Sequence, residues 1–542
     1  MGIQCTPAPT GELPPTERPD PEEPVDPEEP VDPEEPVDPE EPVDPEEPVD
    51  PEEPVDPEEP VDPEEPVDPE EPIRPEEPVD PVDPQEPVGP APVVAQDVVI
   101  VGVSVYQAVE VPLGTDDTSL APVIAGKDAL IRGFLQPLPG FAPRTLRAVV
   151  RLHEGDAVSE HEELVRVLGP TARDSLATGI AVEVPGALLT PSTALSVRLY
   201  ELEPSPSEAR GPVGGLWPEG GGAEPLGALD LGDSVRIRFV PMLYAADGSG
   251  RAPDTSGDWI DTLRDAFLHA TPAPDAAVWV DEPVTLTTPI EPDGDGWSDA
   301  LVLLTDLRDT RNVRADEYVY GLVEPADTYG GYCGRSCVVG LSWRATSPDT
   351  AWARTSLGIG YPGQSAQDTF VHELGHAHGR AHTPCGGPAS PDPAYPHAGG
   401  LLGWQGWDMG SGALLAADEH GDVMGYCRPR WTSDYTFAAL AERMAWVAAS
   451  PMMLPAPGWP KAVQVIEAGP SPRSLGTLTL TRPPTGPTRA VEVLDASGTT
   501  LYTTTVPVQH FEHTRRDALL VPEQSHRAAA AVRVDGAVVP LD

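Results

Sequence analysis

Apolar and polar residues alternate in short runs after residue 96, and this pattern predicts β-strands. The runs are separated by proline and glycine turns. The first four begin at Val98, Ala129, Leu146 and Ala194. We therefore expect a β-sandwich over residues 93–234, of the immunoglobulin-like type.

The next part of the chain, residues 235–455, mixes strand and helix patterns. Residues 258–268 place Ile260, Leu263, Phe267 and Leu268 on one face of a helix. Strands are expected at Val235, Val278, Tyr318 and Val338. This mixture predicts an α/β domain. After residue 455 the β-rich runs return, so residues 456–542 are expected to form a small C-terminal β-domain.

Residues 20–92 show neither pattern. Residues 21–80 are ten hexads, nine reading Pro-Glu-Glu-Pro-Val-Asp and one, 69–74, reading Pro-Glu-Glu-Pro-Ile-Arg. Proline at every third residue matches the three-residue turn of polyproline II, and like charges extend it further. We expect a disordered, stiff spacer that spans roughly 200 Å at about 3.1 Å per residue.

The first 19 residues are expected to be disordered. Cys5, just before the acidic segment, is typical of a mature bacterial lipoprotein whose signal peptide is missing from this chain, although Gln4 is a poor residue to precede a lipidated cysteine. A free cysteine in a disordered end is the alternative. Lipid on Cys5 would make the spacer a tether.

Composition then narrows the class of protein. The formal net charge is −56, and 34 of the 89 acidic residues lie in residues 1–92. Such a charge repels phosphate backbones, so no nucleic-acid partner is expected. No apolar run is long enough for a transmembrane helix. Only two lysines and one asparagine occur, which indicates a GC-rich and hence bacterial genome.

One segment carries metal-binding chemistry: Thr369-Phe-Val-His-Glu-Leu-Gly-His-Ala-His-Gly-Arg-Ala-His382. His372 and His376 lie four residues apart, so on a helix both imidazoles project from one face and can bind one Zn²⁺ ion. Gly379 can end the helix in the left-handed conformation, which brings His382 back as a third ligand. Three imidazoles leave the fourth position open for water, as a catalytic zinc requires. Glu373 is placed to take a proton from that water.

The rest of this segment is interpreted structurally. Phe370 and Leu374 form the opposite, buried side of the helix. We interpret His378 and Arg380 as solvent-facing and not as ligands. The fixed residues of HExxHxxGxxH arise by chance at about 10⁻⁷ per position, which disfavours a merely histidine-rich surface helix.

Here the sequence resembles the metzincin clan of zinc endopeptidases, whose hallmark is HExxHxxGxxH followed by a methionine turn. The second part is present as Gly421-Asp-Val-Met-Gly-Tyr-Cys427. The resemblance implies that Met424 forms an apolar floor beneath the zinc. It also implies that Tyr426 binds the zinc or stabilises the tetrahedral intermediate, as the matching tyrosine does in astacins and serralysins. A core role for Tyr426 is the alternative.

The surrounding sequence looks closer to a group of large secreted bacterial metzincins, some of which cleave mucin-type glycoproteins. The residues that carry this likeness are 395–403, 424–427 and 431–437. The resemblance covers residues 235–450 and, more loosely, the β-domain before them. Thr383 after the third histidine departs from the adamalysin and matrixin forms, so the substrates of those families are not transferred.

Four cysteines follow the spacer, and an even number outside the cytosol favours disulfides. Cys385 follows the third ligand and Cys427 follows the methionine turn, two segments that the metzincin arrangement brings together. The resemblance therefore implies a Cys385–Cys427 bond, with Cys333–Cys337 closing a small loop. A four-cysteine zinc site is the alternative, which the absence of CxxC spacing disfavours.

Residues 291–299 are typical of the start of a calcium loop. Val302 stands where the bidentate glutamate belongs, so an ordinary acidic turn is favoured over a Ca²⁺ site.

Together these features predict a monomeric zinc endopeptidase that acts on extracellular protein or glycoprotein substrates, secreted or held at the bacterial envelope. A catalytically silent binding or adhesion protein on a metzincin scaffold is the alternative. Intact Glu373 disfavours it, because an inactivated relative would be expected to lose its base first.

Overall fold

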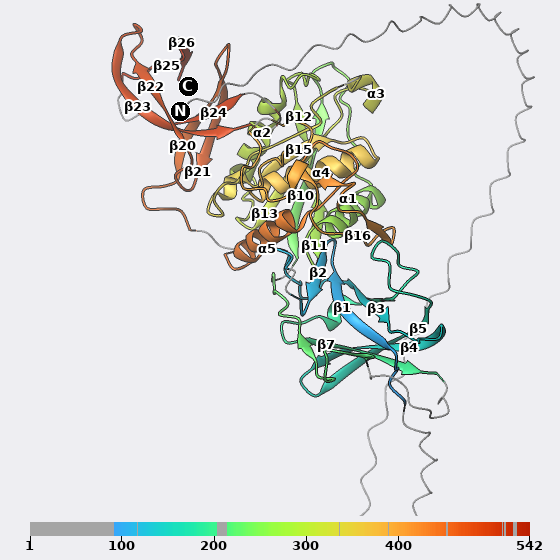
Figure 1. Cartoon of the computed structure of the whole chain (residues 1–542). Coiled ribbons are helices and arrows are strands. Elements are labelled where there is room, and N and C mark those ends of the chain that lie inside the picture. The colour runs from blue at the N-terminus through green and yellow to red at the C-terminus, as the bar shows by residue number, and fades with distance from the viewer. Residues whose placement is uncertain are drawn as a thin grey trace, which may run out of the picture. The chain divides into compact units, whose positions relative to one another are not determined.

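The computed structural model describes residues 92–541 except 116–117, 203–213, 233, 335, 389, 451–453, 512, 514–515 and 524–527. The predicted acidic spacer and Cys5 lie outside these residues. The described residues belong to one unit of mutually contacting chain, built mostly from β-sheets with five helices among the described residues (Figure 1). None of the described helices is long and apolar enough to cross a membrane.

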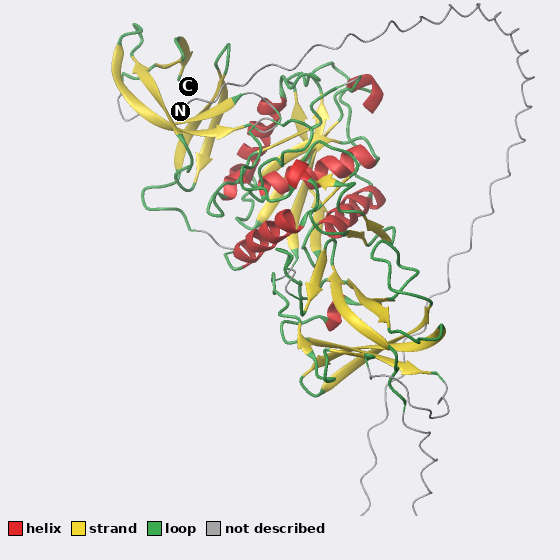
Figure 2. Ribbon diagram, in the orientation of Figure 1, coloured by secondary structure: helices red, strands yellow, loops and turns green. Residues whose placement is uncertain are grey.

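Two antiparallel sheets come first along the chain (Figure 2). Their orders are β2-β1-β3-β6 and β5-β4-β7-β8, with β9 also paired to β7. Buried side chains of both sheets, such as Ile131 and Val197, belong to one apolar core, so the two sheets pack on each other. The immunoglobulin-like type stays a prediction. The strands are Val98–Tyr106 (β1), Glu110–Leu113 (β2), Ala129–Pro137 (β3), Arg144–Glu154 (β4), Ala157–Val167 (β5), Ile180–Val184 (β6), Ala194–Glu201 (β7), Leu216–Trp217 (β8) and Glu224–Pro225 (β9).

A largely parallel sheet forms the centre of the chain. Its order is β11-β10-β13-β15-β14, with β12 also paired to β10, and the edge strand β14 alone runs antiparallel to its neighbour. The strands are Val235–Tyr244 (β10), Ala276–Val280 (β11), Val284–Leu286 (β12), Glu317–Val323 (β13), Gly340–Ser342 (β14) and Thr355–Ile359 (β15). The helices are Gly257–Ala270 (α1), Trp297–Thr310 (α2), Tyr329–Tyr332 (α3), Gln364–Ala377 (α4) and Asp434–Ala448 (α5).

Helices cover both faces of this sheet. Phe370 of α4 packs against Phe239 of β10 and Tyr320 of β13, with ring centroids 5.2 and 4.8 Å apart. Successive strand residues point to opposite faces, and a Cβ atom at Gly321 would collide with Leu304 of α2. Therefore α2 covers the face opposite to α4.

A seven-stranded sheet follows α5, in the order β21-β20-β24-β23-β22-β25-β26. Val463 and Val465, on one face of β20, join the apolar core of the central part, whereas Ile466 on the other face joins a separate core. The C-terminal sheet is therefore packed onto the central part. Its strands are Lys461–Ala468 (β20), Arg473–Leu480 (β21), Thr488–Leu494 (β22), Thr500–His510 (β23), Asp517–Pro522 (β24), Ala531–Val534 (β25) and Ala537–Pro540 (β26). Two short strand pairs lie before α5: Gly406–Asp408 (β16) with Ala413–Leu415 (β17), and Gly421–Asp422 (β18) with Arg430–Trp431 (β19).

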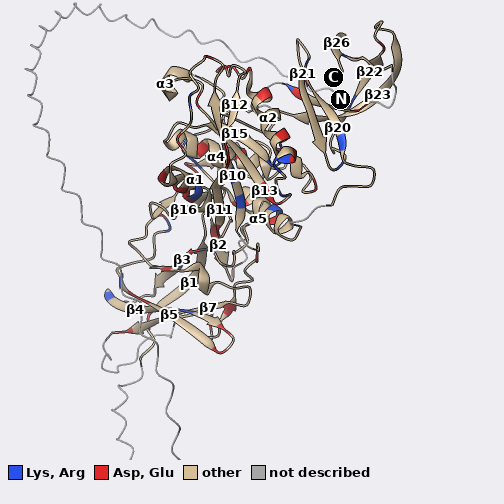
Figure 3. Cartoon of the chain, turned by 180° about the vertical axis from the view of Figure 1, so that it is seen from behind, with Lys and Arg blue, Asp and Glu red and all other residues tan. Residues whose placement is uncertain are grey.

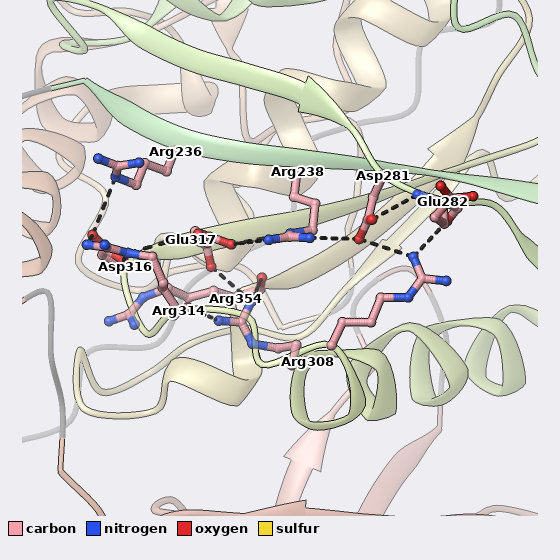
Figure 4. Close-up of polar contacts among 10 residues, drawn as sticks. Arg236, Arg238, Asp281, Glu282, Arg308, Arg314, Asp316, Glu317 and Arg354 are labelled. Carbon is pink, nitrogen blue, oxygen red and sulfur yellow. Dashed lines mark hydrogen bonds and ion pairs between the residues drawn. The ribbon is translucent and has the colours of Figure 1, made fainter.

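Charged side chains fasten the end of the central sheet where β10 and β13 begin. Figure 4 shows Arg238 between Glu317 and Asp281, at 2.9 and 2.8 Å. Arg308 of α2 is buried and donates hydrogen bonds to the carbonyl oxygens of Glu317 and Arg354. Elsewhere acidic and basic residues are interspersed on the described elements (Figure 3).

Candidate metal centre

Helix α4 carries two of the three predicted ligands, His372 and His376, and is buried on every side from Thr369 to Ala377. The helix ends at Ala377, and Gly379, two residues later, has a φ of +95°. A Cβ atom there would lie 2.6 Å from Arg443 Nη2 and 2.8 Å from the carbonyl oxygen of Ala345, so only glycine fits the turn. The turn returns the chain toward the helix and places His382 beside His376.

Three histidines converge. The Nδ1 atoms of His372 and His376 lie 2.7 Å from the carbonyl oxygens of Val423 and Arg380. These bonds orient the rings so that Nε2 is presented to a ligand. The Nε2 atoms of His376 and His382 are 3.2 Å apart. All three side chains are 0–3% exposed.

The donor set fits a metal ion. His372 Nε2 is buried without a hydrogen-bond partner, which a bound cation would supply. Burial lowers the pKa of His372 and of His376 well below the usual value, so both rings are neutral, as a ligand must be. The 3.2 Å separation matches the spacing of about 3.3 Å between nitrogens bound tetrahedrally at about 2.0 Å. The histidine cluster can therefore hold a metal ion.

Glu373 and Tyr426 stand beside this cluster. Glu373 is 1% exposed, and its Oε2 atom is buried without a hydrogen-bond partner. The Tyr426 hydroxyl lies 3.0 Å from His382 Nε2, and the side chain is 39% exposed, which disfavours the core alternative. A cleft of about 670 Å³, a size typical of ligand sites, opens here and is lined by His372, Glu373 and Tyr426 among others.

Met424 lies against the ligand helix. Its side chain is fully buried, and a Cβ atom at Gly375 would collide with its Sδ atom. Asp422, which the sequence reasoning missed, holds this turn: its Oδ1 accepts from the Met424 amide at 2.8 Å and its Oδ2 from the Ser433 amide at 3.0 Å. Burial raises the pKa of Asp422. Its only sequence signal is its place two residues before the methionine.

Both predicted cysteine pairs are at disulfide distance. The Cα atoms of Cys385 and Cys427 are 5.4 Å apart, and those of Cys333 and Cys337 are 5.3 Å apart. The first bond joins the segment after His382 to the methionine turn. Backbone hydrogen bonds join the same segments, from the Thr383 amide to the Met424 carbonyl and from the Tyr426 amide to the Cys385 carbonyl.

A fourth histidine at this centre was not anticipated. His513 lies between β23 and β24, and its ligand atom is within 4.8 Å of those of His372, His376 and His382. This is the only cluster of His, Cys, Asp and Glu among the described residues that is close enough to share an ion. A lone histidine in a strand-rich segment so far downstream gives no sequence signal.

The interpretation of His378 and Arg380 as solvent-facing is wrong. His378 is 2% exposed, and burial lowers its pKa to about 3. The side chain of Arg380 is 13% exposed, pairs with Asp392 at 3.3 Å, and lies over the Tyr435 ring. The reason is that α4 is enclosed on all sides, so a residue that does not face the metal centre still faces protein. Neither residue belongs to the histidine cluster.

Carboxylates of the acidic segment 291–299 form ion pairs with arginines of the C-terminal part of the chain. Asp299 pairs with Arg473 at 2.6 Å, and Asp295 pairs with Arg516. Val302, at the position of the missing glutamate, is buried in α2. These pairings use the carboxylates that a calcium ion would need, and a Ca²⁺ site here stays unsupported.

Comparison with known proteins finds one family whose model matches part of the chain. Residues 351–424, which hold α4, the three histidines and Met424, match the model of the family Peptidase M66. No curated protein matches the chain. One solved structure, described as "Structure of a chaperone-substrate complex", is similar at 12% identity over 51% of this chain, with a TM-score of 0.24. The chain covers 40% of that structure's chain, which is less than two thirds of its length. The family match falls on the segment that carries the metal centre, and it supports a peptidase.

Proposed function

We propose that the chain is a zinc-dependent endopeptidase of metzincin type that hydrolyses peptide bonds in extracellular proteins. The observation that carries the proposal is the buried, unpartnered Nε2 atom of His372 beside His376 and His382, with Glu373 next to it on the same helix. The peptidase family match over this segment supports the same reading.

The residues have distinct roles in this reaction. A zinc ion held by His372, His376 and His382 would polarise the scissile carbonyl and lower the pKa of a water molecule. Glu373 accepts the proton of that water at a carboxylate oxygen and returns it to the leaving amine. The Tyr426 hydroxyl donates a hydrogen bond to the developing oxyanion. Met424 and Asp422 hold the segment beneath the ligand helix.

The cysteines support an extracellular location. Two disulfides in one chain are typical of proteins that fold in an oxidising compartment. Mucin-type glycoproteins are the substrate class that the sequence resemblance favours. A lipid on Cys5 would hold the enzyme at the envelope.

The test uses the purified full chain with casein and a mucin-type glycoprotein, and measures zinc content and cleavage. We expect one zinc ion per chain and cleavage that a zinc chelator abolishes and added zinc restores. Glu373→Gln should lower the rate by about 10²- to 10⁴-fold. Glu442→Gln, an exposed position on α5, is the matched control and should keep the wild-type rate. A chain that binds no zinc, or equal rates with and without Glu373, would contradict the proposal.

A further inference from the structure

The C-terminal sheet contributes a side chain to the metal centre. The His513 ring lies 4.9 Å from the ring of His372, 5.3 Å from that of His376 and 4.8 Å from that of His382, measured between centroids. No other element of the described chain outside residues 372–426 brings a histidine, cysteine or carboxylate into this cluster.

His513 contacts the two groups on which the proposed reaction depends. One ring nitrogen, Nε2, lies 2.9 Å from Glu373 Oε1. The other, Nδ1, lies 2.8 Å from the Tyr426 hydroxyl. The hydrolytic water must lie within hydrogen-bond distance of Glu373 and within reach of the metal. The His513 ring lies beside Glu373, and its ligand atom is within 4.8 Å of those of the three other histidines, so the ring occupies the space where that water belongs.

The position of His513 is built into the fold. β23 and β24 are paired up to His510 and Asp517, and the Phe511 amide donates to the Arg516 carbonyl. Phe511 is fully buried against Trp343, with ring centroids 4.9 Å apart, and bridges to it. Trp343 directly follows β14, the edge strand of the central sheet.

Charged contacts fasten the same part of the C-terminal sheet to α2 and the segment before it. Arg516 pairs with Asp295 and with Glu467, and Glu467 accepts a hydrogen bond from Ser298 of α2 at 2.7 Å. Phe511 and Arg516 are thus anchored to the part of the chain that carries the metal centre.

The backbone conformation of His513 also supports a functional role for this residue. Its φ is +64°, in the left-handed region that costs energy for any residue except glycine. Such conformations persist where the surrounding structure enforces them, and they gather at functional sites.

Building on the proposed zinc peptidase, we propose that His513 is a fourth protein ligand of the metal ion and slows cleavage by the wild-type chain. A zinc site with four protein ligands is closed, whereas a catalytic site keeps one position for water. The ring nitrogen that does not bind the ion can still form a hydrogen bond, with Glu373 if it is Nε2 or with Tyr426 if it is Nδ1. Cleavage then requires that the His513 ring leave the ion.

The test uses the full chain loaded with Co²⁺, which takes the place of zinc and reports its ligands in the visible spectrum. In His513→Ala, water replaces an imidazole, so we expect a shifted spectrum and Co²⁺ affinity about 10- to 100-fold weaker. Added imidazole should restore the wild-type spectrum. The zinc-loaded variant should cleave casein faster than the wild type. His510→Ala, a matched change in the same strand outside the cluster, should keep the wild-type spectrum and rate.

An unchanged Co²⁺ spectrum and affinity in His513→Ala would overturn the proposal, and a fall in cleavage with that unchanged spectrum would make His513 a catalytic group instead. If the alanine variant does not fold, His513→Cys decides: a thiolate-to-cobalt charge-transfer band supports ligation, and its absence in a folded, loaded chain overturns it. These outcomes are separate from the fate of the proposed function. If no variant cleaves any substrate, the peptidase proposal fails while the spectra still report the ligands.

Discussion

The imidazole of His378 stacks on the phenol ring of Tyr318, with centroids 4.1 Å apart and planes 10° from parallel. Its Nδ1 atom lies 2.7 Å from the carbonyl oxygen of Leu374. His376, two residues earlier, turns instead to the metal centre. Two histidines at the end of α4 therefore have different surroundings: His378 packs against the sheet, and His376 belongs to the cluster that can hold an ion.

This difference predicts opposite outcomes for two alanine variants. His378→Ala should lower the free energy of unfolding by about 1–3 kcal/mol, because it empties a buried site, and should keep its zinc. His376→Ala should lose zinc binding. Denaturant unfolding and zinc content of the two purified proteins check this. A folded His378→Ala chain that binds no zinc would show that the stacked ring is a ligand after all.

The histidines also show how far sequence reasoning reaches. The spacing of His372 and His376 and the glycine that returns His382 are local features, so their convergence could be predicted. That His378 is buried depends on Tyr318 of β13 and Phe267 of α1, whose rings pack against it, and no local pattern reports those contacts. His513 depends on how the C-terminal sheet packs against the central part, which no spacing along the chain encodes.

The secondary structure, too, could be predicted where it depends on a local pattern but not where it depends on tertiary contacts. The alternating runs at residues 98, 129, 146 and 194 are strands as predicted, because alternation is a local consequence of one buried face. Helix α2 was not predicted. Its N-terminal end lies in the segment interpreted as an acidic turn, and it becomes a helix because Trp297, Leu301 and Leu304 are buried against the sheet.

The two disulfides should contribute unequally. In the chain-entropy description, a bond across 42 residues stabilises by about 4 kcal/mol and one across 4 residues by about 2 kcal/mol. Cys385→Ala with Cys427→Ala should therefore lower the unfolding midpoint more than Cys333→Ala with Cys337→Ala. The first pair also joins the segment after His382 to the methionine turn, so its loss should weaken zinc binding. Thermal unfolding and zinc affinity of the two double variants check this, and equal zinc affinity in both would contradict the second part.

Asp422 should matter through its charge as well as its shape. Asp422→Asn keeps the size of the side chain but turns an amide donor toward the Met424 or the Ser433 amide, so one buried donor loses its acceptor. We expect a loss of about 1–3 kcal/mol in the free energy of unfolding and weaker zinc binding. Asp418→Asn, at an exposed position in the same loop, is the control. Similar stability of the two variants would mean that the carboxylate does not hold the methionine turn.

Lys127 predicts how stability depends on pH. Its Nζ atom donates to the carbonyl oxygens of Leu268 and Ala273, at 2.6 and 3.3 Å, and burial lowers its pKa from 10.5 to about 7. Between those two pH values the unfolded chain holds a proton that the folded chain has released. Stability must therefore rise with pH over this window, and below pH 7 both states are protonated and this contribution is constant.

The slope attributable to Lys127 is up to about 1.4 kcal/mol per pH unit, because one unit of pKa shift corresponds to that free energy. Lys127→Met should remove it, so the difference in unfolding free energy between variant and wild type should change steadily from pH 7 to pH 9. Lys461→Met changes the other lysine of the chain, which is exposed, and should follow the wild-type curve in parallel. Denaturant unfolding at each pH gives the three curves. If the Lys127→Met curve also runs parallel to that of the wild type, Lys127 is not the group that titrates, and the buried amine keeps its proton through the bonds to the two carbonyl oxygens.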